Sequence, residues 1–126
     1  MEKAEEFIAR KNKEFQREKS KQIKVKDIGR KGKHTFLREA WVFMPQYDNP
    51  EKVFVIERLR WNKIDGESAH SGFSKEKVEY RFGYYIIGKI GNKKGKWTWG
   101  QYCPFIPIKD FDRLITLAKD KGVILA

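Results

Sequence analysis

The chain has 126 residues, of which 40% are hydrophobic and 36% are charged, and its formal net charge is +11. This length suits a single domain with one modest core. No apolar run approaches the ~20 residues of a membrane-spanning helix, and no signal-peptide core follows Met1, so we expect a soluble, cytoplasmic protein with no membrane partner.

Cys103 is the single cysteine of the chain. One thiol excludes an internal disulfide and is too few for a structural zinc site. Free cysteine is usually buried, and Cys103 stands between Tyr102 and Pro104, so we expect a small core residue rather than a nucleophile. No motif in the chain requires a cofactor or a metal ion.

The positive charge is concentrated in two segments. Residues 1–40 hold thirteen Lys and Arg against seven Asp and Glu, and residues 77–106 hold six against one, which gives +6 and +5. Such concentrations are typical of proteins that contact phosphate backbones or anionic surfaces. A lysine-rich coat that only keeps the protein in solution is the alternative.

The first 34 residues predict a basic N-terminal helix or arm, and residues 35–126 predict the sheet and a C-terminal helix of the same domain. Residues 1–22 are highly charged with a narrow apolar stripe, which indicates an exposed helix that contributes little to the core. Residues 24–33 are basic and contain two glycines, so they form either a short edge strand with a loop or a flexible arm that contacts phosphates.

Residues 35–44 begin with helix-forming residues and turn into a β-rich run, and residues 47–51 have the Asp, Asn and Pro of a turn. Residues 52–61 predict a strand whose start, apolar on both faces, is central in the sheet. Residues 62–74 form a loop of thirteen residues. A loop of that length is a candidate functional loop.

Two aromatic-rich runs, residues 78–90 and 96–106, predict a long hairpin. The turn between them, residues 91–95, contains the Gly and Asn that tolerate positive φ. Gly83 and Gly88 within the first run indicate β-bulges or strong local twist.

A helix follows the hairpin. Acidic residues lie near its start, and Gly122 follows two lysines as a C-terminal stop. The apolar residues that repeat at helical spacing are Ile108, Phe111, Leu114, Ile115 and Ala118. The elements together predict the α+β class, with a twisted antiparallel sheet of four or five strands packed against the C-terminal helix, and a charged N-terminal helix or arm.

The hairpin carries the candidate binding residues. Single-stranded nucleic acids are commonly held by rings that stack on bases and by cations that follow the phosphates. The residues of these types are Arg81, Tyr85, Lys89, Lys93, Lys94, Lys96, Trp97, Trp99 and Tyr102. They predict a non-enzymatic protein that binds nucleic acid, with single-stranded DNA or RNA favoured.

Trp97 and Trp99 share a face of their strand, because side chains alternate with period two. If that face points inward, the tryptophans fill the core against the C-terminal helix, and Lys96, Thr98 and Tyr102 become the outward set. Both interpretations stay open at this point.

Two other functions are alternatives. Asp65, Glu67 and His70 in the long loop, with Glu57 and Glu79 on strands, are the one group that resembles a metal or acid–base site, as in a small metal-dependent nuclease or toxin-like enzyme. Nothing in the sequence makes these side chains converge, and solvated loop residues explain them better. The third alternative is an interaction module whose basic face contacts an acidic protein.

The region from Lys52 to Lys121 resembles the single-stranded-DNA-binding domain of the transcriptional positive coactivator and its small bacterial relatives. The resemblance rests on Glu79-Tyr-Arg-Phe before a Lys/Gly turn, and on a short strand that runs into the helix of residues 111–118. It implies an antiparallel sheet, a homodimer formed through the helix, and DNA bound on a concave sheet face, with Arg81, Lys96 and Trp99 at binding positions. Pro104-Phe-Ile-Pro107 and the N-terminal forty residues have no counterpart in that domain.

Overall fold

The structure, a computed structural model, describes residues 1–26, 33–65 and 77–125. Its elements in chain order are α1 (Ala4–Arg17), β1 (Gln22–Lys26), β2 (Lys33–Gln46), β3 (Asn49–Asp65), β4 (Val78–Ile87), a short 3-10 helix η2 (Gly91–Lys93), β5 (Trp97–Trp99) and α2 (Ile108–Asp120). The predicted α+β class is confirmed, including the C-terminal helix and the charged N-terminal helix. Within the described ranges, no helix combines the length and the apolar character that crossing a membrane requires.

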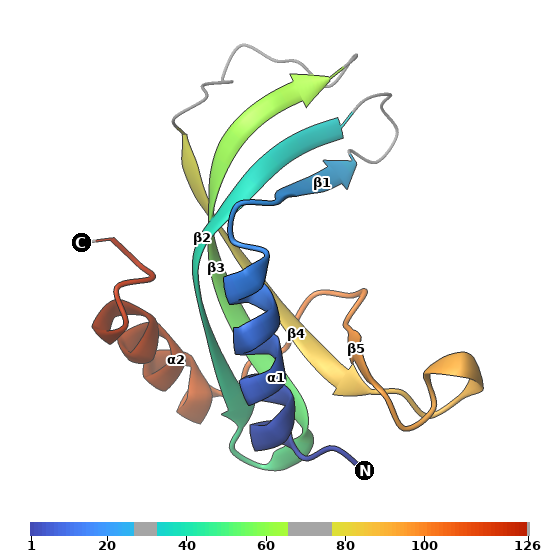
Figure 1. Cartoon of the computed structure of the whole chain (residues 1–126). Helices are drawn as coiled ribbons and strands as arrows, with labels where there is room; N and C mark the ends of the chain where they lie inside the picture. Colours follow the sequence, from blue (N-terminus) through green and yellow to red (C-terminus); the bar gives the residue numbers. More distant parts are fainter. Residues whose placement is uncertain (27–32, 66–76, 126) are drawn as a thin grey trace.

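The five strands form one antiparallel sheet in the order β1-β2-β3-β4-β5, so each strand pairs with the next along the chain. β3 is central, as its apolar start predicts, and β1 is the short edge strand that is one of the two alternatives predicted for this segment. β2 shifts register against β3 at three places, and such irregularities bend a strand. In Figure 1 the sheet curls, with both helices near the turn between β2 and β3 and with β1 at the other end.

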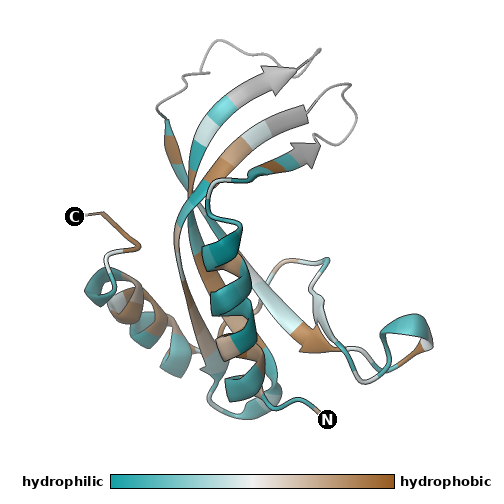
Figure 2. Cartoon of the chain, in the orientation of Figure 1, coloured by the Kyte–Doolittle hydropathy of each residue, from teal (hydrophilic) through white to brown (hydrophobic). Residues whose placement is uncertain are grey.

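Each face of the central strand is covered by a helix. Alternate residues of a strand point to opposite faces, and Phe54 and Ile56 belong to the cluster that α2 covers, while Val53 and Val55 belong to the cluster that α1 covers. In Figure 2 hydrophobic residues gather where the strands pass between the helices, whereas the outer side of α1 is hydrophilic. The start of β3 is apolar on both faces because neither face meets solvent.

α1 belongs to the core, which corrects the expectation of an exposed helix that contributes little. Phe7 is 1% exposed and Phe15 is 3% exposed. The Phe7 ring stacks on Trp97 with the ring centroids 4.7 Å apart, and Phe15 packs edge-on against Trp41 at 5.4 Å. Two phenylalanines suffice for the narrow apolar stripe of α1, because large rings of the sheet fill the remaining space.

α2 covers the opposite face through Leu114 and Ala118. Asp110 in its first turn is fully buried, and its Oδ2 accepts the backbone N–H of Tyr47 at 3.2 Å. A carboxylate near a helix N-terminus is stabilised by the helix dipole, so Asp110 ties the start of α2 to the turn between β2 and β3. Gly122, with φ of +73°, ends the helix as predicted.

β4 and β5 form the predicted hairpin, but β5 is three residues long, and it pairs with Tyr85–Ile87 alone. Gly91 and Gly95 have φ of +63° and +75°. Such values favour glycine, which explains the composition of the turn.

The sequence predicts β-bulges or strong local twist at Gly83 and Gly88, and a bulge is found opposite Gly88. The Gly88 N–H donates to the Lys96 carbonyl at 3.0 Å and its carbonyl accepts the Gly95 N–H at 2.9 Å, so two residues face one. Gly83 forms no bulge. The pairing of β4 with β3 continues through Gly83 without a shift. A Cβ added at Gly83 would lie 2.2 Å from the Trp99 ring, and one added at Gly88 would lie 2.3 Å from the Lys93 carbonyl oxygen. Both glycines therefore allow close approach of another part of the hairpin.

We expect Phe7→Ala to destabilise the protein by about 3–5 kcal/mol, because it opens a cavity between α1 and the rings of Tyr85 and Trp97. Urea unfolding followed by circular dichroism measures the change. Lys13→Ala on the exposed side of α1 is the control, and it should change the free energy of unfolding by less than about 0.5 kcal/mol. Equal stability of the two variants would contradict a core role for α1.

Candidate functional site

The nine residues predicted to bind nucleic acid lie in three different environments. Tyr85 and Trp97 are partly buried beneath α1, Arg81 and Trp99 lie beside one another on the same sheet face, and the others are exposed near the tip or just beyond β5: Lys89, Lys93, Lys94, Lys96 and Tyr102. The hairpin thus has a structural base, formed by Tyr85 and Trp97 beneath α1, and an exposed tip, which carries Lys93, Lys94 and Lys96.

Trp97 contacts the N-terminal helix, and not the C-terminal helix that the sequence suggested as its alternative neighbour. It pairs with Ile87 across the hairpin, and Trp99 pairs with Tyr85, so the two tryptophans share a face, as predicted. That face is the one that α1 covers. Besides stacking on Phe7, Trp97 donates its Nε1–H to the Glu2 carbonyl at 2.9 Å. A ring held on its face and at its polar edge is not available to stack on a base.

Tyr85 is the second ring of the structural base. Its centroid lies 5.0 Å from that of Phe7 and 5.1 Å from that of Trp99. Burial, with a smaller contribution from the negative charge of Glu57, raises the pKa of the Tyr85 hydroxyl to about 12. Tyr85 is therefore a neutral packing residue at physiological pH.

Trp99 is a partly exposed ring, with 37% of its surface accessible. Its six-membered ring lies directly over Gly83, where no side chain intervenes. The guanidinium carbon of Arg81 lies 5.0 Å from the Trp99 centroid, within the range of a cation–π contact. Trp99 presents one accessible side, while its other contacts hold it on the sheet.

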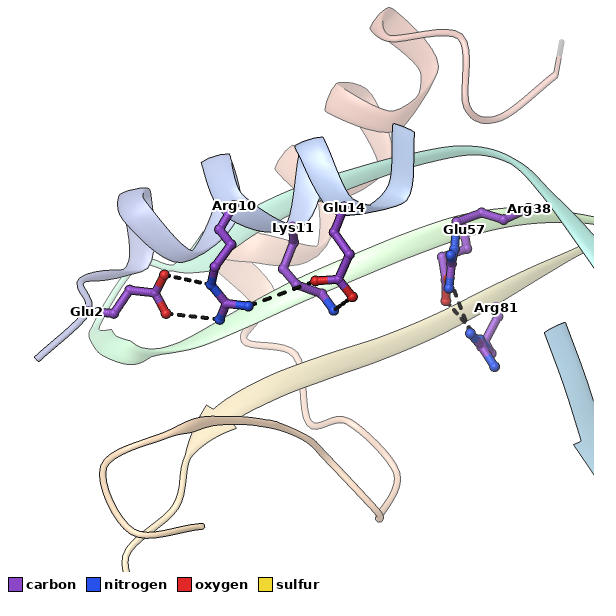
Figure 3. Close-up of polar contacts among 7 residues, drawn as sticks. All are labelled: Glu2, Arg10, Lys11, Glu14, Arg38, Glu57 and Arg81. Atoms are coloured by element: carbon purple, nitrogen blue, oxygen red, sulfur yellow. Dashed lines mark hydrogen bonds and ion pairs between the residues drawn. The ribbon is translucent and has the colours of Figure 1, made fainter. Parts of the chain in front are cut away.

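Arg81 is held by a buried carboxylate that the sequence had placed in a candidate acid–base group (Figure 3). Its Nε donates to Glu57 Oε1 at 2.8 Å, and its Nη2 donates to Oε2 at 3.2 Å. Arg38 donates its Nε to Glu57 Oε2 at 2.6 Å from the other side. Glu57 is 1% exposed and is neutralised by two cations, so it is neither a metal ligand nor a proton acceptor for a substrate.

Glu57 and its arginines also separate two apolar regions of the sheet. At the end of the sheet away from the helices, a small separate cluster is formed by Phe36, Leu59 and Trp61. The Phe36 and Trp61 rings meet edge-on with their centroids 5.6 Å apart. Sequence reasoning missed the two ion pairs of Glu57, because Arg38 and Arg81 lie nineteen and twenty-four residues from Glu57 in the chain.

The tip of the hairpin carries the exposed cations. Lys93, Lys94 and Lys96 form no ion pair with any described residue, whereas Lys89 pairs with Glu51. The sequence contains no Asp or Glu between Glu79 and Asp110. The three tip lysines therefore keep their full attraction for an external anion.

A shallow hollow of about 170 Å³ lies beside these lysines. Tyr84, Ile86 and Tyr102 provide its apolar surface, and Lys93, Thr98 and Gln101 provide polar groups. Its volume is below the roughly 300–1,000 Å³ of a small-molecule pocket. It is therefore suited to part of a larger ligand rather than to an enclosed metabolite. Tyr102 is 81% exposed, so its ring is open to a partner.

A second hollow, of about 670 Å³, lies between α1, α2 and β2. Its ionisable lining residues are Lys13 and Lys121, and it has no carboxylate, histidine or cysteine. It thus offers lysines but none of the carboxylate, imidazole or thiol groups that bind metal ions in proteins.

The residues proposed for a nuclease are not brought together in the described part of the chain. Glu67 and His70 lie outside the described residues, as does the side chain of Asp65 at the end of β3. Glu79 is paired with Lys77 at 3.6 Å. Among the residues that the structure describes, no group of three or more His, Cys, Asp or Glu could hold a metal ion.

Cys103 is exposed, which corrects the expectation that it is a core residue. It follows Tyr102 in the segment that leaves β5 for α2, where the chain no longer forms part of the sheet. Cysteine is usually buried, but the position of Cys103 in this connecting segment leaves it exposed.

Comparisons of this chain with protein-family models, with curated proteins and with solved structures find no significant match. They neither support nor oppose the resemblance to the coactivator domain. A function has to be argued from the geometry of the site.

We expect Glu57→Gln to destabilise the protein by about 3–5 kcal/mol, because it leaves Arg38 and Arg81 partly buried without a counter-ion. Thermal and urea unfolding measure the loss. Glu79→Gln removes a carboxylate of the same region that is exposed, and it should change stability by about 1 kcal/mol or less. Similar losses in the two variants would contradict the central role of Glu57.

Stability should also fall at alkaline pH through Tyr85. Its folded pKa of about 12 exceeds the ordinary value of 10.0, so the contribution of the neutral hydroxyl is complete below pH 10 and is lost as the pH rises to about 12. Comparing urea unfolding of the wild type with that of Tyr85→Phe isolates this effect. The wild type should lose roughly 2 kcal/mol relative to the variant over this interval; a constant difference would contradict the raised pKa.

Proposed function

We propose that the protein binds single-stranded nucleic acid at the tip of the β4–β5 hairpin, without chemical conversion of the ligand. The observation that carries this proposal is the combination of three lysines that form no ion pair with a described residue and an exposed tyrosine beside a shallow hollow. Lys93, Lys94 and Lys96 contact phosphates, and Tyr102 offers a face on which a base stacks.

The state of the cations supports this location. Most arginines of the described sheet and helices are bound by carboxylates, as Arg10 is by Glu2 and Arg81 is by Glu57. Such cations have lost part of their attraction for an external phosphate. The tip lysines have not, and neutralising phosphates with them releases counter-ions, which favours binding at low salt.

The geometry of the hollow supports a single strand over a duplex. A base can stack on Tyr102 only when it is not paired and stacked within a helix. Thr98 and Gln101 in the lining can form hydrogen bonds with base edges or sugar hydroxyls. DNA and RNA both meet these requirements, and both belong in the binding test.

The contact set is narrower than the nine residues that the sequence predicts. Tyr85 and Trp97 pack beneath α1, Arg81 neutralises Glu57, and Lys89 is paired with Glu51. Trp99 offers one accessible side next to the tip. We assign direct contact to Lys93, Lys94, Lys96 and Tyr102, with Trp99 as a neighbouring surface.

Tyr102→Ala and Lys94→Ala should separate stacking from charge. Tyr102→Ala should weaken binding of a labelled oligonucleotide by about 1–3 kcal/mol at every salt concentration, because a stacked base is lost and no phosphate contact changes. Lys94→Ala should flatten the slope of log affinity against log salt by about 0.7 for one phosphate of a single strand. Fluorescence anisotropy with oligo-dT and oligo-U at several salt concentrations measures both.

Two variants outside the hollow serve as controls. Phe105→Ala removes an equally exposed ring, and Lys119→Ala removes an exposed cation on α2; neither should alter affinity or slope in the same way. Tyr102 is a better probe than Trp99, because the Trp99 ring also packs on the sheet. Absence of binding by the wild type at low salt, or equal effects of Tyr102→Ala and Phe105→Ala, would contradict the proposal.

A further inference from the structure

Among the described residues, nothing pairs with the outer edge of β4 along its first half. β5 pairs only with Tyr85–Ile87, and the hydrogen bond from the Gly100 N–H to the Tyr84 carbonyl, at 2.7 Å, is the last one on that side. The chain then turns away towards α2. From Val78 to Phe82, no described part of the chain pairs with this edge.

The hydrogen bonds of β4 show which backbone groups face outward. The Lys77 carbonyl accepts from Trp61 on the β3 side, whereas the Tyr84 carbonyl accepts on the β5 side. Backbone groups in an antiparallel strand alternate between the two neighbours. The N–H and C=O groups that point to the open edge are therefore those of the even-numbered residues: Val78, Tyr80 and Phe82.

Apolar side chains accompany this open edge. Tyr80 and Phe82 are 39% and 37% exposed, and Leu125, which contacts Tyr80, is 53% exposed. The Leu125 N–H donates to the Tyr80 hydroxyl at 2.8 Å, so the strip continues onto the end of the chain after α2. Soluble proteins protect edge strands with proline, with charged side chains or with a covering segment; residues 78–82 contain no proline, and their two charged side chains, Glu79 and Arg81, have opposite signs.

We propose that this edge is an interface between two copies of the chain, paired antiparallel with Tyr80 opposite Tyr80 of the partner subunit. Val78 then faces Phe82 of the partner subunit, and Glu79 faces Arg81 of the partner subunit. Outward N–H groups meet outward C=O groups at each even-numbered pair, as an antiparallel ladder requires. Two five-stranded sheets become one continuous sheet.

The charges select this register. Sliding one copy by two residues keeps the backbone pairing, but it puts either Glu79 opposite Glu79 of the partner subunit or Arg81 opposite Arg81 of the partner subunit. Like charges directly opposite one another destabilise a sheet, whereas opposite charges stabilise it. Residues 78–82 read apolar, acidic, aromatic, basic, apolar, and this is the self-complementary pattern that a twofold interface needs.

Both charged groups can make the new contact without losing their present ones. Arg81 uses Nε and Nη2 to hold Glu57, and its Nη1 has no hydrogen-bond partner among the described residues. The Glu79 side chain is 44% exposed. The interface differs from the helix-mediated dimer that the resemblance implies, and it does not depend on the proposed binding of nucleic acid.

Disulfide trapping tests the register. In a Cys103→Ser background, Tyr80→Cys places two thiols in a directly opposed, hydrogen-bonded pair whose Cα atoms are about 5.5 Å apart, within the range of a disulfide. Phe82→Cys is the matched control, because its thiol would lie four residues, about 13 Å, from its counterpart. Mild oxidation should give a covalent dimer with Tyr80→Cys and not with Phe82→Cys. The reverse result, or no covalent dimer with either variant, would overturn the proposal.

Sedimentation velocity over a concentration series tests the interface itself. The wild type should form a dimer, Tyr80→Pro should be monomeric because it removes the central outward N–H, and Tyr80→Ala should retain a weaker dimer. Glu79→Lys puts like charges opposite one another and should raise the dimer dissociation constant about tenfold or more, whereas Asp120→Lys, with the same charge change on α2, should not. Circular dichroism confirms folding of each variant. A wild type that stays monomeric, or a dimer that survives Glu79→Lys, would overturn the proposal.

Discussion

The stack of Phe7 on Trp97 joins the N-terminal helix to the last hairpin, and Phe7 also meets Phe43 in the centre of the sheet. A sheet whose central strand is apolar on both faces needs a layer on each side, and α1 supplies the second layer through this contact. Since Trp97 lies on β5, the same contact fixes the base of the hairpin. The tip lysines consequently extend from an anchored strand, and binding there does not require the base of the hairpin to be ordered first.

Several carboxylates of the described residues pair with arginines of the sheet, whereas the lysines at the hairpin tip form no ion pair with a described residue. Glu57 holds Arg38 and Arg81, and Glu39 accepts hydrogen bonds from Arg60 and Arg58, which lower the pKa of its carboxyl. These pairs fix side chains within the sheet. The net charge of +11 therefore attracts external anions unevenly over the surface, because a paired arginine attracts an anion less strongly than a lysine without an ion pair does.

Alternation, turn composition and helical spacing predicted the sheet, the hairpin and α2, because each depends on residues close together in the sequence. The same local signals could not show which helix covers Trp97, since alternation shows that Trp97 and Trp99 share a face but not what lies against it. The charged surface of α1 concealed its core role, because two phenylalanines carry most of the contact. The ion pairs of Glu57 could not be predicted from local signals, because its two arginines lie on other strands. The exposure of Cys103 could not be predicted without knowing where β5 ends.

The charged group formed by Glu57 and its two arginines divides the sheet into units of unequal stability. The end beneath β1 is held by the small cluster around Phe36, Leu59 and Trp61, whereas the other end is packed between two helices. Hydrophobic contact does not run continuously through a layer of ionised groups, so opening of the β1 end need not disturb the packing under the helices. Amide protons of β1 should then exchange by local opening, and those of central β3 between the helices only by global unfolding. The anchored base of the hairpin belongs to the slower unit.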